Sequence, residues 1–588
     1  GGVAEEEGGK WWTGAEERGK RRGAGYALLW TGLWLAVMAA AIKLRPLLPV
    51  DETRYLAVAW EMWRDKNFWV PHLNGETYSH KPPLLFWLMH IGWSIFGVND
   101  WWPRLVAPLF GLLSLFLTAL LVRRLWPGRA TVAVAAPLIL FTCLFWTLFT
   151  TLTMFDMMLT LCALIGMLGI VRAWQDDNPQ AFFWLAVAIG LGGLAKGPAI
   201  LLSVLPVALL APLWTVSPKT DEQEPELDLD GVSMEPAGGT DMWSRGWKRW
   251  YIATGFALVG GIAIALVWAI PAAIMGGEEY RNAIFWGQSA GRMVDSFAHS
   301  RPWWWFLAVL PALVLPWTVW PASWRSLKGL LDIREDNGIR FCLVWFLPAL
   351  ITFSAISGKQ LHYLLPVFPA LALIMGRFLL DHHLLNPDNS AWHRSGLHLP
   401  GALFILFGLV LGIAPLTAEF FDLPSQIASI DFRWGPGLAL FALIVIALTR
   451  SNISLMGRIG TLSILSTVFV IIVHLSLKPV LDERFDLKMV SEKLGEWQRS
   501  GIELAYVGKY HGQFNFMGRL EKPITAIGIQ GSEVEDWVVA NPEGRIVVIV
   551  GQDHPGIHTY YTQPFRGRSI VIIDSAQAIA DPNIIENP

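Results

Sequence analysis

The fold of this chain is decided by residues 131–171, which read TVAVAAPLILFTCLFWTLFTTLTMFDMMLTLCALIGMLGIV. The stretch contains two apolar runs, 131–149 and 152–171, and each is long enough to cross the roughly 30 Å hydrocarbon core of a bilayer as a helix. Asp156 is the one charged residue in it. Because a lipid core accepts only segments that satisfy their own backbone hydrogen bonds, the stretch predicts membrane-spanning helices.

Similar runs recur over most of the 588 residues. The chain is 53% hydrophobic and 16% charged, whereas a soluble domain carries about 25% charged residues. The predicted fold is an all-α polytopic membrane bundle. We place thirteen spans, near 25–43, 104–122, 131–149, 152–171, 181–195, 198–215, 251–273, 304–323, 340–357, 362–380, 400–418, 434–449 and 459–477.

Composition also argues against two other classes of site. The net charge is −3 and no basic stripe is present, so nucleic acid is not expected as a partner. The three cysteines, Cys143, Cys162 and Cys342, fall inside apolar runs without a CxxC pair. We expect them to be small core residues and not zinc ligands or disulfide partners.

Basic residues in the short loops predict the orientation. If the N-terminus is cytoplasmic, almost every Lys and Arg cluster falls on the cytoplasmic side, as the positive-inside rule requires. This arrangement needs the short apolar segment 84–97 to lie along the membrane interface. Loops 44–103 and 274–303 then lie outside, on the non-cytoplasmic side of the membrane, together with the tail.

The chain changes character near residue 480. We assign residues 1–479 to the membrane domain and 480–588 to a soluble α/β domain, because residues 486–498 have helical spacing and residues 545–550 and 569–573 read as buried strands. Inside the membrane domain, the segment 217–240 is acidic and poor in apolar residues. It is expected to be a cytoplasmic linker.

Charged residues at the predicted outer surface are the candidates for chemistry. Asp51, Glu52 and Arg54 follow the first span directly, as a solvated loop start, an interfacial ion pair, or a carboxylate aimed into a cavity as base or metal ligand. Asp156 near the outer end of its helix is a functional candidate, or else a structural hydrogen-bond acceptor between helices.

Cations at the same depth could hold a lipid phosphate. Lys81, held by the Lys81-Pro82-Pro83 turn, is either a snorkelling anchor or a phosphate ligand, and Lys196 and Lys359 lie where spans end. Acids, cations and aromatics at headgroup depth suit a lipid-linked sugar. A lipid phosphatase or a flippase would need similar charges, so spacing alone leaves these alternatives open.

At these residues the chain resembles the GT-C glycosyltransferases of the protein O-mannosyltransferase superfamily. The resemblance rests on Asp51-Glu52, His80-Lys81-Pro82-Pro83, the Gly-Leu-Ala-Lys-Gly-Pro at 193–198 and the Tyr-Leu-Leu-Pro at 363–366. Within the superfamily it is most similar to the bacterial lipid A aminoarabinose transferases. This implies transfer of 4-amino-4-deoxy-L-arabinose from undecaprenyl phosphate to lipid A phosphates among the periplasmic membrane lipids, which favours polymyxin resistance.

The resemblance also implies roles for individual residues. Asp51 resembles the catalytic acid, Asp156 the second acid of the site, and Lys81 the residue that holds the donor phosphate. The remaining expected substrate-binding residues are Glu52, Arg54, Tyr55, Tyr78, His80, Lys196, Lys359 and Tyr363. No cofactor is certain. A divalent metal ion stays open, because Asp51, Asp156 and the Glu and His side chains of the outer loop 274–303 could supply ligands although no spacing requires one.

Three rival interpretations follow from the same residues. A protein O-mannosyltransferase or another polyprenyl-phosphate-sugar transferase would share the site and differ in its acceptor or sugar. A flippase would favour paired halves with broken helices at the midplane, and the sequence has no internal repeat. A structural scaffold is disfavoured by Asp156 inside an apolar helix.

Overall fold

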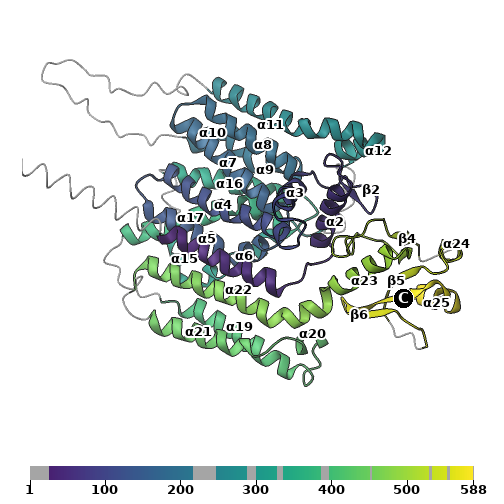
Figure 1. Ribbon diagram of the computed structural model, residues 1–588. Helices are drawn as coiled ribbons and strands as arrows, with labels where there is room; N and C mark the ends of the chain where they lie inside the picture. The colour runs from purple at the N-terminus through teal and green to yellow at the C-terminus, as the bar shows by residue number, and fades with distance from the viewer. Residues whose placement is uncertain are drawn as a thin grey trace, which may run out of the picture.

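The computed structural model describes residues 25–215, 247–287, 300–327, 336–385, 396–449, 453–528, 533–551 and 556–586. The acidic segment 217–240 and the middle of the loop 274–303 lie outside these residues. Figure 1 shows a bundle of long helices with the C-terminal strands at one end. The small elements α2, α3 and α12 lie at this same end.

Long apolar helices make up most of the described chain. Nine of them are long enough to cross a membrane. They are Gly25–Leu44, α4 (Trp101–Leu125), α7 (Asp156–Gln175), Pro179–Lys196 (η1, Pro179–Ala181, with α8, Phe182–Lys196), α11 (Lys248–Met275), α16 (Asn337–Ala355), Leu361–Leu380 (η5, Leu361–Val367, with the start of α17, Phe368–Leu385), α19 (His398–Thr417) and Leu455–Arg499 (α22, Leu455–Phe485, with α23, Lys488–Arg499). The chain is therefore a multi-pass membrane protein.

Four further predicted spans have a different form in the structure. The run 131–149 is the bent pair α5 (Ala130–Thr142) and α6 (Leu144–Thr150), with 72° between them. Two runs are the shorter helices α9 (Ala199–Leu209) and α21 (Trp434–Leu448). The run 304–323 is broken into α14 (Trp305–Leu313), η3 (Trp317–Val319) and α15 (Pro321–Ser326). The total of thirteen spans is thus a prediction that the described helices do not settle.

Helix α7 lies at the centre of the bundle. It packs against α4, α8 and η5, and 83% of its 18-residue apolar segment is buried inside the protein. Its sequence suits both ends, because Asp156 in the first turn and Arg172 in the last turn complement the helix dipole. The central position of α7 places the carboxylate of Asp156 deep inside the protein and not toward lipid.

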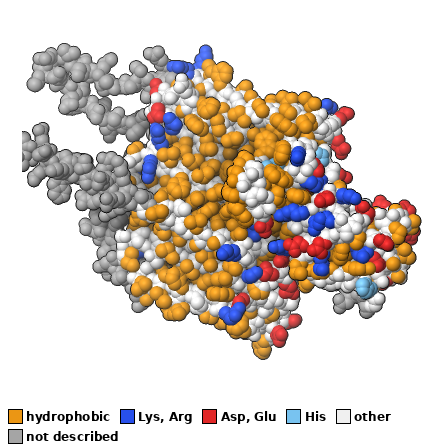
Figure 2. All heavy atoms as spheres, viewed as in Figure 1, with side chains coloured by type: hydrophobic (Ala, Val, Ile, Leu, Met, Phe, Trp, Pro, Cys, Tyr) orange, Lys and Arg blue, Asp and Glu red, His pale blue; other side chains and the backbone are white. Residues whose placement is uncertain are grey.

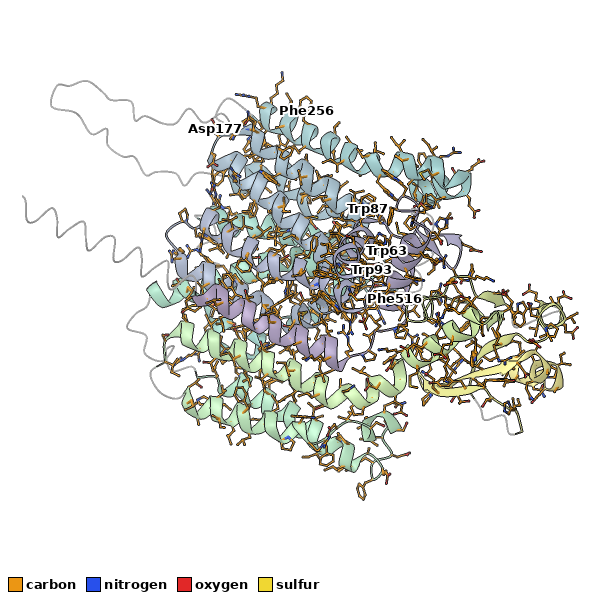
Figure 3. The ribbon with its side chains drawn as sticks, viewed as in Figure 1. Trp63, Trp87, Trp93, Asp177, Phe256 and Phe516 are labelled. Carbon is orange, nitrogen blue, oxygen red and sulfur yellow. The ribbon has the colours of Figure 1, made fainter. Side chains whose placement is uncertain are left out.

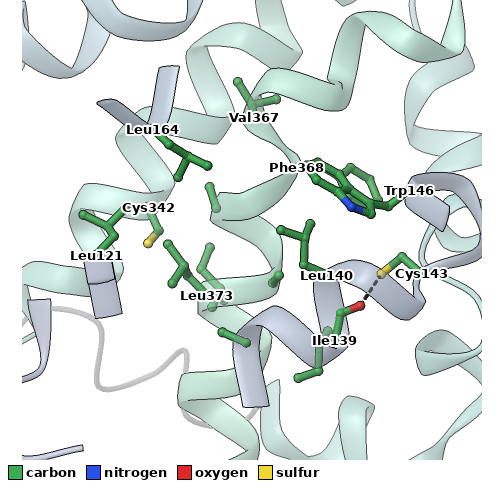
Figure 4. Packing of buried hydrophobic residues seen from close by; sticks show 14 of the residues in the cluster. Leu121, Ile139, Leu140, Cys143, Trp146, Leu164, Cys342, Val367, Phe368 and Leu373 are labelled. Atoms are coloured by element: carbon green, nitrogen blue, oxygen red, sulfur yellow. Dashed lines mark hydrogen bonds between the residues drawn. The ribbon is translucent and has the colours of Figure 1, made fainter. Parts of the chain in front are cut away.

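Small residues let α8 and α11 approach closely. A Cβ added at Gly190 would lie 2.6 Å from Ile264, and one added at Gly261 would lie 2.5 Å from Ile189. Glycine at such contacts permits the van der Waals packing that holds membrane helices together. The cysteines belong to the same packed interior: all three are buried and free, as predicted, and Figure 4 shows Cys143 and Cys342 among leucine and aromatic side chains.

The C-terminal strands form one sheet with the order β4-β3-β5-β7-β6. The strands are β3 (Leu504–Val507), β4 (Thr525–Ile527), β5 (Arg545–Val550), β6 (Tyr561–Phe565) and β7 (Arg568–Asp574). Strand β3 runs parallel to β4 and β5, whereas β7 is antiparallel to β5 and β6. The predicted strands 545–550 and 569–573 correspond to β5 and β7, and the predicted helix 486–498 corresponds to α23.

Both faces of this sheet are covered, because alternate side chains point to opposite sides of a strand. Val547, Ile570 and Ile572 pack with α23, and Ile546, Val548 and Ile573 pack with α24 (Glu533–Ala540), α25 (Ser575–Ala580) and α26 (Asn583–Glu586). The assigned boundary at 479/480 falls within α22, which continues without a break to Phe485.

Residues 44–103 fold into a layer between the bundle and the sheet. The layer contains α2 (Asp51–Arg64), a hairpin of β1 (His72–Leu73) and β2 (Glu76–Thr77), and α3 (Leu84–Phe96). Asn74 and Gly75 form the hairpin turn with φ of 55° and 84°, the left-handed conformation that an Asn-Gly pair adopts readily. The remaining short helices are α10 (Ala211–Trp214), α12 (Gly277–Asn282), η2 (Ala283–Gly287) and α20 (Ser425–Ala428).

The C-terminal region rests directly on this layer. Trp60 Nε1 donates to the Leu520 carbonyl at 2.9 Å, and the side chain of Asn74 exchanges two hydrogen bonds with the backbone of Ile524. The rings of Trp93 and Phe516 stack with 5.6 Å between their centroids, as Figure 3 shows. These contacts fix the C-terminal region against the second half of α2, the hairpin and α3.

Candidate functional site

Asp51 and Asp156 each begin a helix, α2 and α7 respectively, at the end of the bundle that carries the C-terminal sheet. The side chain of Asp51 is 58% exposed, whereas that of Asp156 is only 3% exposed. Figure 2 shows hydrophobic side chains along the bundle and charged ones gathered toward its ends. The two carboxylates therefore occupy two depths of one polar region.

The buried carboxylate of Asp156 is paired with a lysine. Lys196 Nζ lies 2.5 Å from Asp156 Oδ1, at the end of α8, where Gly197 turns the chain with φ of 68°. Lys196 Nζ also lies 5.6 Å from the centre of the Tyr363 ring. Besides Lys196, the groups whose charges act on Asp156 are His362 and Lys81. We call the lysines Lys81 and Lys196, together with the His362 ring beside them, the inner cationic group.

Lys81 reaches this group over an aromatic surface. Its Nζ lies 5.3 Å from the centre of the Phe155 ring, the residue just before Asp156. The Phe155 ring is also packed edge-on against Tyr55, at 4.8 Å, and against Phe86, at 6.0 Å. An ammonium group over an aromatic face keeps its charge while losing part of its water. The inner cationic group can therefore attract an anion that carries an apolar chain.

Asp51 is held by a cation on its own helix. Arg54 Nη2 lies 2.5 Å from Asp51 Oδ1, one turn along α2, and the guanidinium lies 5.6 Å from the Tyr55 ring. Burial raises the pKa of Tyr55 above its ordinary value and raises the pKa of Tyr78 to about 12. Both phenols are therefore protonated at neutral pH and can donate hydrogen bonds. The ring of His80 lies 5.4 Å from that of Tyr78.

Glu52 points away from this region. Its carboxylate is buried and accepts hydrogen bonds from the backbone N–H groups of Leu48, at 2.9 Å, and Thr153, at 3.0 Å. Arg45 Nη2 lies 3.3 Å from the same carboxylate and donates to the Thr151 carbonyl at 2.8 Å. Glu52 thus joins the start of α2 to the segment that leads into Asp156.

Replacing Glu52 with Gln is expected to destabilise the protein. The change leaves the buried Arg45 guanidinium without its anion, and breaking a buried charge pair in this way costs about 3 kcal/mol. The free energy of unfolding, measured by denaturant titration in detergent micelles, tests this. Glu76, exposed in β2, gives the matched control Glu76→Gln, which should leave the free energy within about 0.5 kcal/mol of the native value. Equal values for the two variants would contradict the role of Glu52.

Lys359 is not brought to either aspartate. Its buried Nζ donates to the Arg301 carbonyl at 3.0 Å and to the Ile356 carbonyl. The Arg301 N–H donates to the Ser357 carbonyl, and Ser300 pairs with Gly358 in an isolated β-bridge. Lys359 therefore fastens residues 300–301 to the loop before η5.

Sequence reasoning missed two participants. One is His362, which directly precedes the Tyr-Leu-Leu-Pro motif at 363–366. Its place beside Tyr363 was the available signal. Arg45 ends the first span on the predicted outer side, where the positive-inside rule does not expect a cation, and this exception indicated a buried acidic partner. Its partner Glu52 lies only seven residues along the chain.

The charged side chains here do not form a metal centre. Within the described ranges, no group of three His, Cys, Asp or Glu side chains is placed to hold a metal ion. Asp51 and Asp156 are each paired with a cation instead. A cation-rich site of this kind fits an anionic ligand better than a divalent metal.

Comparisons with known proteins show what this chain resembles in sequence and in fold. A family profile described as dolichyl-phosphate-mannose-protein mannosyltransferase matches residues 80–221. An undecaprenyl phosphate-alpha-4-amino-4-deoxy-L-arabinose arabinosyl transferase of Pseudomonas fluorescens is 28% identical over 395 residues, which cover 61% of this chain and 59% of that protein. The transferase of the same description from Erwinia tasmaniensis is 27% identical, over 66% of this chain and 64% of its own length. The matches thus span about three fifths of these relatives.

Solved structures extend the similarity to nearly the whole chain. The structure of ArnT from Cupriavidus metallidurans in the apo state has a TM-score of 0.68 at 18% identity, and covers 94% of this chain and 99% of its own. The same protein bound to undecaprenyl phosphate has a TM-score of 0.66 at 18% identity, over 93% and 98% of the two chains. This chain therefore has the GT-C glycosyltransferase fold, and in both sequence and structure it is similar to aminoarabinose transferases.

Proposed function

We propose that this chain transfers 4-amino-4-deoxy-L-arabinose from undecaprenyl phosphate to a phosphate group of lipid A. The observation that carries the proposal is the inner cationic group around the buried Asp156, next to the exposed carboxylate of Asp51. Such a site can hold a lipid phosphate at the membrane surface and leave its sugar facing a carboxylate. The sugar and the donor lipid follow from the descriptions of the relatives.

The residues of the site divide the chemistry between them. The bond between the anomeric carbon and the donor phosphate oxygen breaks, and a bond from that carbon to an acceptor phosphate oxygen forms. Lys81 and Lys196 stabilise the charge that returns to the leaving phosphate. An ionised acceptor phosphate needs no strong base, so Asp51 orients the sugar, binds its amine or stabilises its developing positive charge. Direct displacement would invert the anomeric configuration.

The orientation belongs to the same proposal. The N-terminus faces the cytoplasm, and α2, α3 and the C-terminal sheet face the periplasm from the bacterial inner membrane. This is supported by the common position of these elements at one end of the bundle and by the basic loops near the other. The donor and acceptor lipids would then both lie in the outer leaflet of that membrane.

A second candidate function keeps the same site and changes the acceptor. The mannosyltransferase family profile at residues 80–221 favours a protein O-mannosyltransferase or another polyprenyl-phosphate-sugar transferase. A flippase for a lipid-linked substrate is a candidate of another class. It has less support, because α2, which begins with Asp51, lies at one end of the bundle, and the hydrogen bond from Thr153 to Glu52 brings the start of α7, with Asp156, to that end.

Mass spectrometry of lipid A tests the proposal. A bacterial strain that lacks its own aminoarabinose transferase but makes the donor would express either this chain or Asp51→Ala. The native chain is expected to add the mass of aminoarabinose to lipid A, and the variant, present in equal amount in the membrane, is expected to add none. Unmodified lipid A despite confirmed expression would overturn the choice of acceptor and sugar. Glycosylated membrane proteins in that strain would then support the second candidate.

A further inference from the structure

Two turns of the C-terminal region lie against the segment that begins α2. The first is the turn between β6 and β7, where Arg566 and Gly567 have φ of 51° and 80° and the Arg566 guanidinium donates to the Pro49 carbonyl. The second follows β3 and contains Gly512, where an added Cβ would lie 2.5 Å from Leu73 and 3.3 Å from Ala57. Both turns are thus seated beside Asp51.

Each turn brings cations to this place. The charged groups that act on His511 are, in decreasing order, Arg54, Lys509, Arg566 and Asp51. Lys509 and Arg566 are exposed, and Arg54 lies on α2 beneath them. Burial, followed by these cations, lowers the pKa of His511, so that its ring is neutral at neutral pH and can donate one hydrogen bond. We call Arg54, Lys509 and Arg566, with the neutral His511 ring beside them, the outer cationic group.

Asp51 lies within electrostatic reach of both cationic groups. Its charge acts on His362 of the inner group and on His511 of the outer group. The groups differ in their surroundings, because Lys81 and Lys196 of the inner one lie over the Phe155 and Tyr363 rings, whereas Lys509 and Arg566 of the outer one are exposed. A polyprenyl phosphate needs apolar contacts along its chain, and these are found beside the inner group. The outer group does not have to accommodate a polyprenyl chain.

We propose that the outer cationic group binds the acceptor, as a phosphate monoester on a lipid headgroup, and holds its oxygen toward the sugar at Asp51. This inference rests on the proposed function, whose reaction needs two phosphates on opposite sides of one anomeric carbon. Two separate cationic groups within reach of Asp51 supply one site for each phosphate. The C-terminal region then contributes residues to the site in addition to supporting the bundle.

Binding measurements on the full chain in nanodiscs test the inference separately from catalysis. Lys509→Gln is the main variant, because Lys509 is exposed and its replacement is not expected to unfold the protein. Lys522→Gln is the matched control, since Lys522 is a 65% exposed lysine of the same region that faces Glu503 at 3.7 Å. The probes are lipid A with its phosphates, lipid A stripped of them, and undecaprenyl phosphate.

The native chain is expected to bind phosphorylated lipid A more tightly than the stripped form. Lys509→Gln should weaken that binding, and raise the acceptor KM, on the order of fivefold to tenfold, as expected for one lost charge-assisted contact. Binding of undecaprenyl phosphate should not change, and Lys522→Gln should resemble the native chain. Unchanged acceptor binding in Lys509→Gln, or equal binding of both lipid A forms, would overturn the inference. Phosphate-dependent binding without any transfer would overturn the proposed function and leave the anion site standing.

Discussion

Asp51→Asn is expected to lower the rate of sugar transfer about 10²- to 10³-fold, the range typical for loss of one group that stabilises charge in the transition state. The amide keeps the size and the helix position of the side chain but cannot carry charge toward the sugar. Asp51 is exposed at the first turn of α2, and its charge reaches both cationic groups. The measurement is single-turnover transfer from undecaprenyl-linked sugar by the purified chain.

Asp65→Asn is the control for this variant. Asp65 caps the other end of α2 and also pairs with an arginine of that helix, with Arg64 Nε 2.7 Å from its Oδ1. Because this pair lies one helix length away from Asp51, its loss should change transfer less than about twofold. Asp51→Glu should recover part of the activity if charge is what matters. A rate for Asp51→Asn close to that of the control would show that Asp51 does not act in the reaction.

The sequence predicted the elements that depend on local patterns. Apolar runs such as 104–122 and 152–171 become the helices α4 and α7, because the tendency of such a segment to form a membrane helix depends on residues that are adjacent in the sequence. The run 304–323 met the same criterion of composition, and Pro311 is accommodated inside α14. It also contains Pro316 and Pro321, each of which lacks a backbone donor. The structure breaks the run there into three short helices.

The site was harder to predict, because side-chain direction is set by distant contacts. Asp51 and Glu52 are adjacent in the sequence, but successive residues of a helix point about 100° apart. Only one of them can face the site, and the partner Thr153 of Glu52 lies about one hundred residues away. Similarly, Lys196 and Lys359 both stand where spans end. One reaches Asp156 and the other fastens a loop, which no local pattern distinguishes.

The C-terminal contribution is the clearest example of a long-range feature. Arg566 meets Pro49 across more than five hundred residues of sequence. Nothing in the spacing of Lys509, His511 or Arg566 indicates that they lie beside α2. Their position follows from the docking of Leu520, Ile524 and Phe516 onto the layer formed by residues 44–103.

The pair between Lys196 and Asp156 is expected to matter for both stability and activity. Lys196→Met removes the cation and leaves the Asp156 carboxylate buried without it, which costs about 3–5 kcal/mol of unfolding free energy. Asp156→Asn leaves the ammonium unpaired in the same place and should cost a similar amount. The double variant Asp156→Asn with Lys196→Met should recover much of this loss, because no uncompensated charge remains.

Lys478 and Asp482 provide a control with the same geometry and a different environment. Their Nζ and Oδ2 atoms are also 2.5 Å apart, but both side chains are about two fifths exposed on α22. Lys478→Met should therefore cost only about 0.5 kcal/mol, as exposed helix pairs do. Unfolding in a denaturing detergent, followed by tryptophan fluorescence, measures all four variants. A Lys196→Met cost no larger than that of Lys478→Met would refute the buried pair.

Activity separates the structural role of this pair from its chemical role. The double variant is expected to fold and yet to transfer sugar at least about 100-fold more slowly than the native chain, because the leaving phosphate loses the stabilisation that Lys196 provides. If Lys196 served only to neutralise Asp156, the double variant would recover activity together with stability. The position of Lys196 beside Lys81, His362 and the Tyr363 ring, where a phosphate would arrive, favours the first outcome.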